Sequence, residues 1–404
     1  MGTGFAVRKS ETRIWELRMK PGQDLAEITA GIDRLYRAQK QGEGFLDAEG
    51  LIPVAVAAIE PRNFARYADA REALAKLSQT LDSGTGEQLR VDYLGEMIDS
   101  LNALMDTFEG RPIGFAERLR RQIRVDTTVI GDDILDTYRA TIRNGLDELG
   151  YRGGDLAADI TRWEKDTIVP RDTVILVLED LLRQSRRRAA TMYDFSHEWI
   201  EPVGVTDKPF AAYCDYPGRK VLLNLDFPYT VYALKHLATH EAFPGHLVHL
   251  GLRERYVADG SMPLDGAQVV TSSASSALFE GIADNGMAFL DWLDTPGDQI
   301  AVALQRLRSA LRCNAAWMMH EEKKPIDEIA PIIATQGYQT EHTVRGRLAF
   351  LHHDLRAPFV YAYWCGDVAV EKVWNDVPAS ERKRFWHYLY GTMHTPTTLA
   401  KYWQ

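Results

Sequence analysis

The chain has 404 residues, of which 45% are apolar and 26% charged, and its formal net charge is −10. This composition is typical of a globular protein with one large domain or two to three packed subdomains, and its acidity argues against a nucleic-acid-binding surface. Neither a signal-peptide core nor an apolar run of about 18 residues occurs, so a cytoplasmic protein without membrane contact is expected.

Five segments in the first half of the chain carry apolar residues at three- and four-residue spacing, which predicts amphipathic helices. They are Asp24–Gln39, Pro61–Gln79, Val91–Thr107, Gly131–Gly150 and Arg171–Arg188. The basic run Arg183–Arg188 ends the last of them, where positive charge complements the helix dipole. A solvated helix end is therefore favoured there over an anion site.

The segment Phe210–Asp226 interrupts this helical pattern. Two short apolar runs flank the turn residues Tyr216–Arg219, which predicts a hairpin whose second strand is Lys220–Asn224. We therefore expect a mainly α protein, in which a small β-sheet lies next to the helices that follow it. A boundary near residue 200 would separate a helical N-terminal part (1–200) from a catalytic part (201–404).

The next helix carries the sequence HEAFPGHLVH, which begins at His240. Its first two residues open the zinc-peptidase motif H-E-x-x-H, in which two histidines four residues apart share one helical face. Here the second histidine is His246, six residues on. On an unbroken helix the two side chains would point about 120° apart and lie more than one turn from each other, too far to share an ion.

Pro244 and Gly245 change this expectation. Proline removes a backbone donor and clashes with the preceding turn, and glycine tolerates the distorted backbone that results. A kink or bulge at this point would return His246 to the face of His240. The two histidines could then bind zinc, with Glu241 as the general base that deprotonates the zinc-bound water.

A third ligand is expected from the apolar segment around Glu280. Glu280 and Asp284 are four residues apart and share a helix face, so Glu280 can bind metal while Asp284 accepts a hydrogen bond from a ligand histidine. Gly281 would let the two metal-binding helices approach closely. The three cysteines are widely separated, which excludes a thiolate zinc cluster and a disulfide framework.

The residues His240–His246 match every fixed position of H-E-x-x-P-G-H. This is the hallmark of a widespread bacterial family of unknown function, grouped with the zincin-like metallopeptidases, which the chain resembles from about Phe210 to its C-terminus. The family's E-G-W-A block is similar to Glu280–Ala283, and its late P-G-Q-A-L-x-Y-x-x-G block is kept in part at Ala357–Gly366. The resemblance implies a gluzincin-like arrangement around the zinc.

Further polar residues could complete the site. Tyr363, His353 and Arg356 are of the types that stabilise a tetrahedral oxyanion or hold a substrate carboxylate, and they are candidate catalytic residues. His249 could replace one of the ligand histidines. His236, one turn before the motif, is expected to be structural.

The predicted function is a zinc-dependent hydrolase of a peptide or small amide bond, acting on a small molecule or short peptide. The alternative is a non-peptidase metal-dependent enzyme, a hydrolase or lyase of a specialised biosynthetic pathway, or a metal-free binding relative. The intact Glu241 argues against a binding protein, which has no use for a base beside the metal.

The hairpin suggests how a substrate is aligned. If Lys220–Asn224 is an exposed edge strand, its unpaired backbone groups can hold an extended substrate by strand addition across a cleft between the two parts. This arrangement predicts a deep, enclosed pocket and a preference for short substrates.

Overall fold

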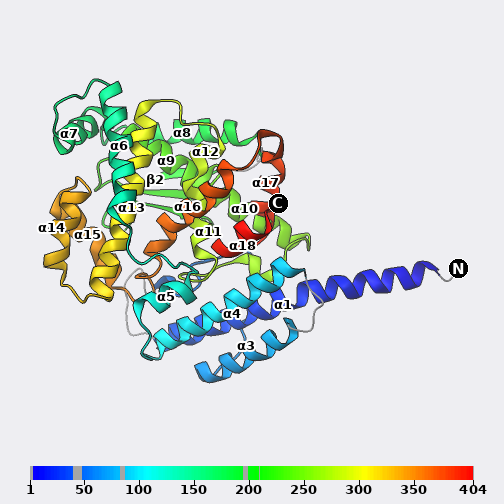
Figure 1. The fold of residues 1–404 in the computed structure, drawn as a ribbon. Helices are drawn as coiled ribbons and strands as arrows, with labels where there is room; N and C mark the ends of the chain where they lie inside the picture. The colour runs from blue at the N-terminus through cyan, green and yellow to red at the C-terminus, as the bar shows by residue number, and fades with distance from the viewer. Residues whose placement is uncertain (1–2, 40–47, 82–86, 194–198, 209, 404) are drawn as a thin grey trace.

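The computed structural model describes residues 3–39, 48–81, 87–193, 199–208 and 210–403, with side chains from residue 19 onward. The described part is mainly helical with small sheets, which confirms the predicted fold class (Figure 1). Within these ranges, no helix combines the length and the apolar character that crossing a membrane requires.

The chain runs from a helical half into a small sheet and back into helices. Before the sheet lie α1 (Thr3–Gln39), α3 (Tyr67–Leu81), α4 (Gln88–Phe108), α5 (Phe115–Gln122), α6 (Asp132–Glu148), α7 (Leu156–Thr167) and α8 (Val174–Ala189). After it lie α9 (Val231–Leu237), α10 (His246–Ala258), α11 (Ser276–Asp284), α12 (Gly286–Phe289), α13 (Pro296–His320), α14 (Ile326–Gln336), α15 (Glu341–Leu348), α16 (Val360–Asn375), α17 (Arg382–Gly391) and α18 (Pro396–Tyr402). Single turns connect some of them: η1 (Ala238–Ala242), η2 (Leu264–Ala267), η3 (Ala349–His352) and η4 (Ala379–Glu381).

The five predicted helices are all present, as α1, α3, α4, α6 and α8. Three begin within three residues of the expected position, and the other two begin further away. Helix α1 begins at Thr3 and continues through Pro21, and α3 begins at Tyr67 because the preceding residues are held by α1: the Arg62 backbone N–H donates to the Glu27 carbonyl at 3.0 Å. The basic run Arg183–Arg188 forms the last turns of α8, as expected.

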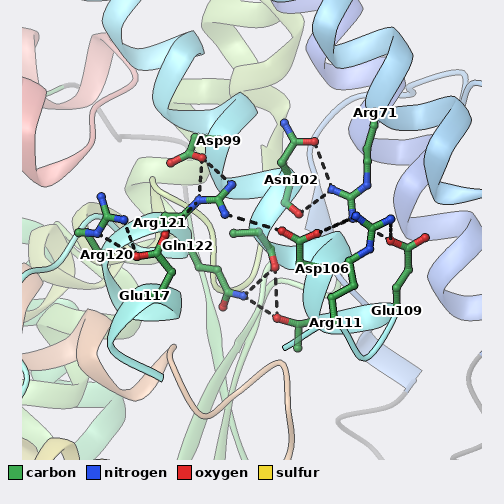
Figure 2. A network of polar contacts seen from close by, with 12 residues as sticks. Arg71, Asp99, Asn102, Asp106, Glu109, Arg111, Glu117, Arg120, Arg121 and Gln122 are labelled. Atoms are coloured by element: carbon green, nitrogen blue, oxygen red, sulfur yellow. Dashed lines mark hydrogen bonds and ion pairs between the residues drawn. The ribbon is translucent and has the colours of Figure 1, made fainter. Parts of the chain in front are cut away.

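A polar network joins α3, α4 and α5 (Figure 2). Arg71 of α3 forms ion pairs of 2.9 Å with both Asp106 and Glu109, and Arg121 of α5 donates to Asp99 of α4 at 2.8 Å. These side chains are partly solvated, so each pair contributes only about 1 kcal/mol or less. We attribute to them the relative orientation of the three helices.

A three-stranded sheet lies next to the histidine-bearing segment. Its order is β2–β4–β3, with β4 (Lys220–Asn224) parallel to β2 (Glu201–Val205) and antiparallel to β3 (Ala212–Asp215). The predicted hairpin is therefore confirmed as β3–β4. A second sheet pairs the short strands β1 (Val54–Ala55) and β5 (Gln268–Val269).

The prediction that Lys220–Asn224 is an exposed edge strand is wrong. β4 is the central strand and is paired along its whole length on both sides. Its second partner, β2, contains Pro202 and Gly204. These two residues argue against a strand when only the sequence is known, but an edge strand such as β2 tolerates them. The edge strand next to η1 is β3.

Apolar cores join the two halves of the chain. One core surrounds the sheet and the histidine helices and includes the fully buried Leu182, Val221 and Leu247. Another contains Ile142 of α6 and Leu307 of α13, and a third lies among α1, α3 and α4. Each of the first two cores combines side chains from before and after residue 200.

Candidate metal centre

The histidine-bearing helix breaks where the sequence predicted it would. Helix α9 continues into the widened turn η1, which contains His240, and α10 begins at His246 after three irregular residues. The break brings the two imidazole rings to a centroid distance of 4.6 Å. Two histidines six residues apart in sequence thus lie side by side.

Gly245 makes this break possible. A Cβ atom at this position would lie 1.8 Å from the carbonyl oxygen of His240, so no other residue fits without a backbone shift. The Gly245 N–H donates to the Thr239 carbonyl at 2.9 Å, and Tyr390 donates its hydroxyl to the Pro244 carbonyl at 2.9 Å. The chain is therefore held tightly between the two histidines.

Glu280 of α11 faces both histidines. The Nε2 atoms of His240 and His246 each lie 3.6 Å from Oε2 of Glu280. Two ligand atoms about 2.1 Å from one tetrahedral zinc ion lie about 3.4 Å apart, which these separations approach. Oε2 of Glu280 and Nδ1 of His246 are buried without a hydrogen-bond partner in the described part of the chain. The donor set and its unsatisfied buried carboxylate oxygen fit a zinc ion.

Asp284, one turn after Glu280, lies behind His240. Its Oδ1 is 2.9 Å from Nδ1 of His240 and 3.3 Å from Nε2 of His236. Burial alone would raise the pKa of Asp284, but the two histidines hold it below its ordinary value. Burial alone would lower the pKa of His240, but Asp284 outweighs this effect and raises it to about 10. A proton on Nδ1, shared with Asp284, leaves Nε2 directed at Glu280, as a ligand histidine requires.

Gly281 has a different partner from the predicted one. A Cβ atom there would lie 2.2 Å from the backbone of Gly366, and a Cβ on Gly366 would lie 1.8 Å from the Ala277 carbonyl oxygen. Gly281 therefore allows α11 to approach α16, not the histidine helix. Because Tyr363 is on α16, this close approach brings its side chain to the cavity that Glu280 also lines.

A cavity of about 170 Å³ opens beside the three predicted ligands. Glu241 lines it together with His240, His246 and Glu280, and the ligand atoms of Glu241 and the two histidines lie within 4.8 Å of one another. Glu241 is 6% exposed. A buried carboxylate beside two imidazoles can accept a proton from a water molecule held there.

Aromatic and polar side chains complete the lining of the cavity. Phe210, Phe279, Phe350 and Phe359 belong to it, and so do the predicted Tyr363 and Arg356. The Phe279 ring stacks on the imidazole of His246. The Tyr363 hydroxyl has no hydrogen-bond partner in the described part of the chain. Burial raises the pKa of Tyr363 well above its usual value, so its hydroxyl remains a proton donor at neutral pH.

The other histidine candidates are not at the cavity. His353 is not among its lining residues. Nε2 of His249 accepts from the Arg253 guanidinium at 3.1 Å, and its ring packs against Phe279. Burial and the Arg253 charge hold the pKa of His249 well below its usual range. His236, expected to be structural, approaches the same Oδ1 of Asp284 that contacts His240, and the two rings lie 5.5 Å apart.

Three titratable lining residues were not anticipated from the sequence: Glu49, Tyr213 and Cys214. Tyr213 and Cys214 are adjacent residues in the first strand of the predicted hairpin, β3. Side chains along a strand point alternately to its two faces, so this alternation could have identified which of the two points inward. Glu49 lies between α1 and β1, 307 residues before its ion-pair partner Arg356, and no local pattern marks it.

No family model matches the chain, and no curated protein matches it. Solved structures with a similar fold include "the putative lipoprotein from Colwellia psychrerythraea", with a TM-score of 0.55 and 12% identity over 82% of this chain. Another is "a putative lipoprotein of unknown function from Shewanella oneidensis", with a TM-score of 0.54 and 14% identity over 83% of this chain. This chain spans 65% and 70% of their lengths, respectively. At such identities the likeness shows the fold alone.

These comparisons correct two expectations. The resemblance to a zincin-like metallopeptidase family is wrong as an assignment, because no family model matches and the structural neighbours are described as lipoproteins, one of them of unknown function. The short segment His240–His246 shows a local geometry and does not define a family. The expected cytoplasmic location is also wrong, because both structural neighbours are described as a "putative lipoprotein". Lipoproteins are anchored to a membrane by their lipid.

Proposed function

We propose that the protein is a zinc-dependent hydrolase of a peptide or small amide bond. The proposal rests on one observation: the buried Nε2 of His240, Nε2 of His246 and Oε2 of Glu280 converge beside Glu241 at one cavity. Three protein ligands with an open position are typical of catalytic zinc sites.

His240, His246 and Glu280 would hold the ion, and Asp284 would orient His240. Zinc bound there would act as a Lewis acid toward a water molecule and a substrate carbonyl. Glu241 is placed to accept the proton of the attacking water and to return it to the leaving amine. The carboxylate has no hydrogen-bond partner in the described residues that would compete for this role.

Tyr363 supplies a second polar contact for the reaction. Its hydroxyl is unpartnered and protonated, so it can donate to the oxygen that becomes negative when the amide is attacked. The Phe359 ring packs edge-on against the Tyr363 ring, with 5.4 Å between the centroids, and adds apolar surface beside it.

The size of the cavity supports a small substrate. A cavity of about 170 Å³ has room for on the order of ten water molecules, enough for a dipeptide-sized amide but not for a folded protein. β3, the edge strand that lines the cavity with Ala212, Tyr213 and Cys214, is available to align an extended substrate in place of β4.

The Glu241→Gln variant tests the proposal, because glutamine keeps the shape but cannot accept the proton. Turnover of a panel of short N-acylated dipeptides, followed by mass spectrometry, should fall by about 10² or more, while zinc content stays unchanged. Equal turnover in both proteins would remove Glu241 from the mechanism. Zinc bound without any turnover in the wild type would favour a binding protein.

A further inference from the structure

The charges around the cavity are unevenly distributed. Glu241, Glu280 and Asp284 lie at the metal end, where a zinc ion and histidines would balance them. The charge of Glu280 acts on the Tyr363 phenol, and the guanidinium groups of Arg312 and Arg356 act on it with the opposite sign. We call the side of the cavity that Arg356 lines the basic end.

Arg356, at the basic end, has an N–H group that no described residue accepts. It is 6% exposed and pairs with Glu49, whose carboxylate also interacts with the Tyr213 hydroxyl. The Nε atom of Arg356 is buried without a hydrogen-bond partner in the described residues. Glu49 thus has two donors directed at it, whereas one N–H of Arg356, a residue that lines the cavity, has no acceptor among the described residues.

Arg312 of α13 adds a positive charge that no carboxylate balances. Its guanidinium lies 5.4 Å from the centre of the Tyr363 ring, and its one side-chain hydrogen bond in the described part of the chain is to the Ser309 hydroxyl, at 3.3 Å. Its Nε is also buried without a partner. The nearby Glu164 is occupied by Arg308, at 2.8 Å.

Arg347 of α15 adds a further positive charge close to Arg312. Its charge acts on Arg312 and on Tyr229, and no hydrogen bond or ion pair joins it to any described residue. Tyr229 donates to the Ala211 carbonyl, next to the lining residues of β3. Arg312 and Arg347 are partly buried and have no ion-pair partner among the described residues, whereas Arg356 is buried and pairs with Glu49. Positive charge in excess of its carboxylate partners points to an anion that binds beside these groups.

We propose that Arg356, which lines the cavity, and Arg312, whose guanidinium lies over the Tyr363 ring, form a subsite for a carboxylate group of the substrate. This inference rests on the proposed hydrolase function and names its substrate class: a small N-acyl amino acid or dipeptide-sized amide with a free carboxylate and an apolar or aromatic body. The scissile carbonyl lies at the metal end, the carboxylate at the arginine end and the apolar body among the phenylalanine rings. A planar guanidinium is suited to a carboxylate because it can donate two parallel N–H groups.

Binding of a matched pair of probes to the full-length protein tests the subsite. N-acetyl-L-phenylalanine carries the carboxylate, and N-acetyl-L-phenylalaninamide replaces it with a neutral group of the same shape. Titration calorimetry is done after chelation of metal and again with zinc added. The chelated protein tests the arginine subsite by itself, whether or not the hydrolase proposal holds.

The carboxylate probe should bind about tenfold more tightly than the amide to the chelated protein. Arg312→Gln should remove most of this preference, and Arg356→Lys, which keeps the charge opposite Glu49, should reduce it without loss of folding. Arg66→Gln, at a solvated ion pair with Asp69, should leave it unchanged. Equal binding of the two probes, no binding of either, or a preference that survives Arg312→Gln in a folded protein would overturn the inference.

Discussion

Nδ1 of His240 lies 2.9 Å from Oδ1 of Asp284, although 44 residues separate them in the chain. The contact directs the other nitrogen of the ring toward Glu280 and thus determines whether the ring can bind metal. It joins η1 to α11, two elements whose sequences show no pairing pattern beyond their histidines and carboxylates.

The Asp284→Asn variant should weaken zinc binding by about 10- to 100-fold, because an amide orients and polarises the imidazole less well than a carboxylate. A competition titration with a zinc chelator measures the affinity. Asp291→Asn, at an exposed ion pair with Arg382, is the matched control and should bind zinc like the wild type. An unchanged affinity in Asp284→Asn would show that the contact does not support a metal ligand.

Zinc binding should release about one proton per ion at pH 7.5. In the metal-free protein the pKa of His240 is raised to about 10, so the ring is protonated below that pH, whereas zinc requires a free ring nitrogen. Zinc affinity should therefore rise with pH until about pH 10. Calorimetry in two buffers of different ionisation enthalpy measures the protons released, and identical heats in both buffers would contradict the prediction.

Gly245→Ala should disrupt the site and destabilise the fold by about 1–3 kcal/mol or more, because the added methyl group overlaps the His240 carbonyl oxygen. Gly95→Ala in α4 is the matched control: its methyl group meets nothing within 4 Å, and alanine is the better helix former by about 1 kcal/mol. Urea unfolding and zinc content are measured on both. A Gly245→Ala protein with wild-type stability and zinc content would show that the break tolerates a side chain.

Part of the site is predictable from the sequence alone. Glu280 and Asp284 were predictable because their four-residue spacing puts them on one helix face, and the approach of His246 to His240 was predictable because Pro244 and Gly245 mark a break between them. The fold class and the β3–β4 hairpin follow from similarly local patterns.

Contacts between distant segments were not predictable. Pairing of β2 with β4 made an expected edge strand central, and nothing near Lys220–Asn224 indicates this partner. Gly281 was correctly identified as a point of close approach, but its partner Gly366 lies on another helix. The pair between Glu49 and Arg356 depends on tertiary packing alone.

Tyr363→Phe should slow amide hydrolysis by about 10²–10³-fold while zinc remains bound, because it removes the hydroxyl proposed to donate to the developing oxyanion. Tyr361→Phe on the same helix is the control. Its hydroxyl donates to the Cys313 carbonyl in the protein interior at 2.9 Å, so its loss should cost about 1 kcal/mol of stability without changing turnover. Similar turnover losses in the two variants would assign Tyr363 a structural role.

The anomalous signal of a zinc-soaked crystal, recorded on both sides of the zinc edge, tests the central claim most directly. A single strong peak is expected about 2.0–2.2 Å from Nε2 of His240, Nε2 of His246 and a carboxylate oxygen of Glu280, with Glu241 next to it but not coordinated. A peak bound elsewhere, or none at these residues in a crystal soaked with excess zinc at neutral pH, would contradict the assignment of this cluster as a metal centre.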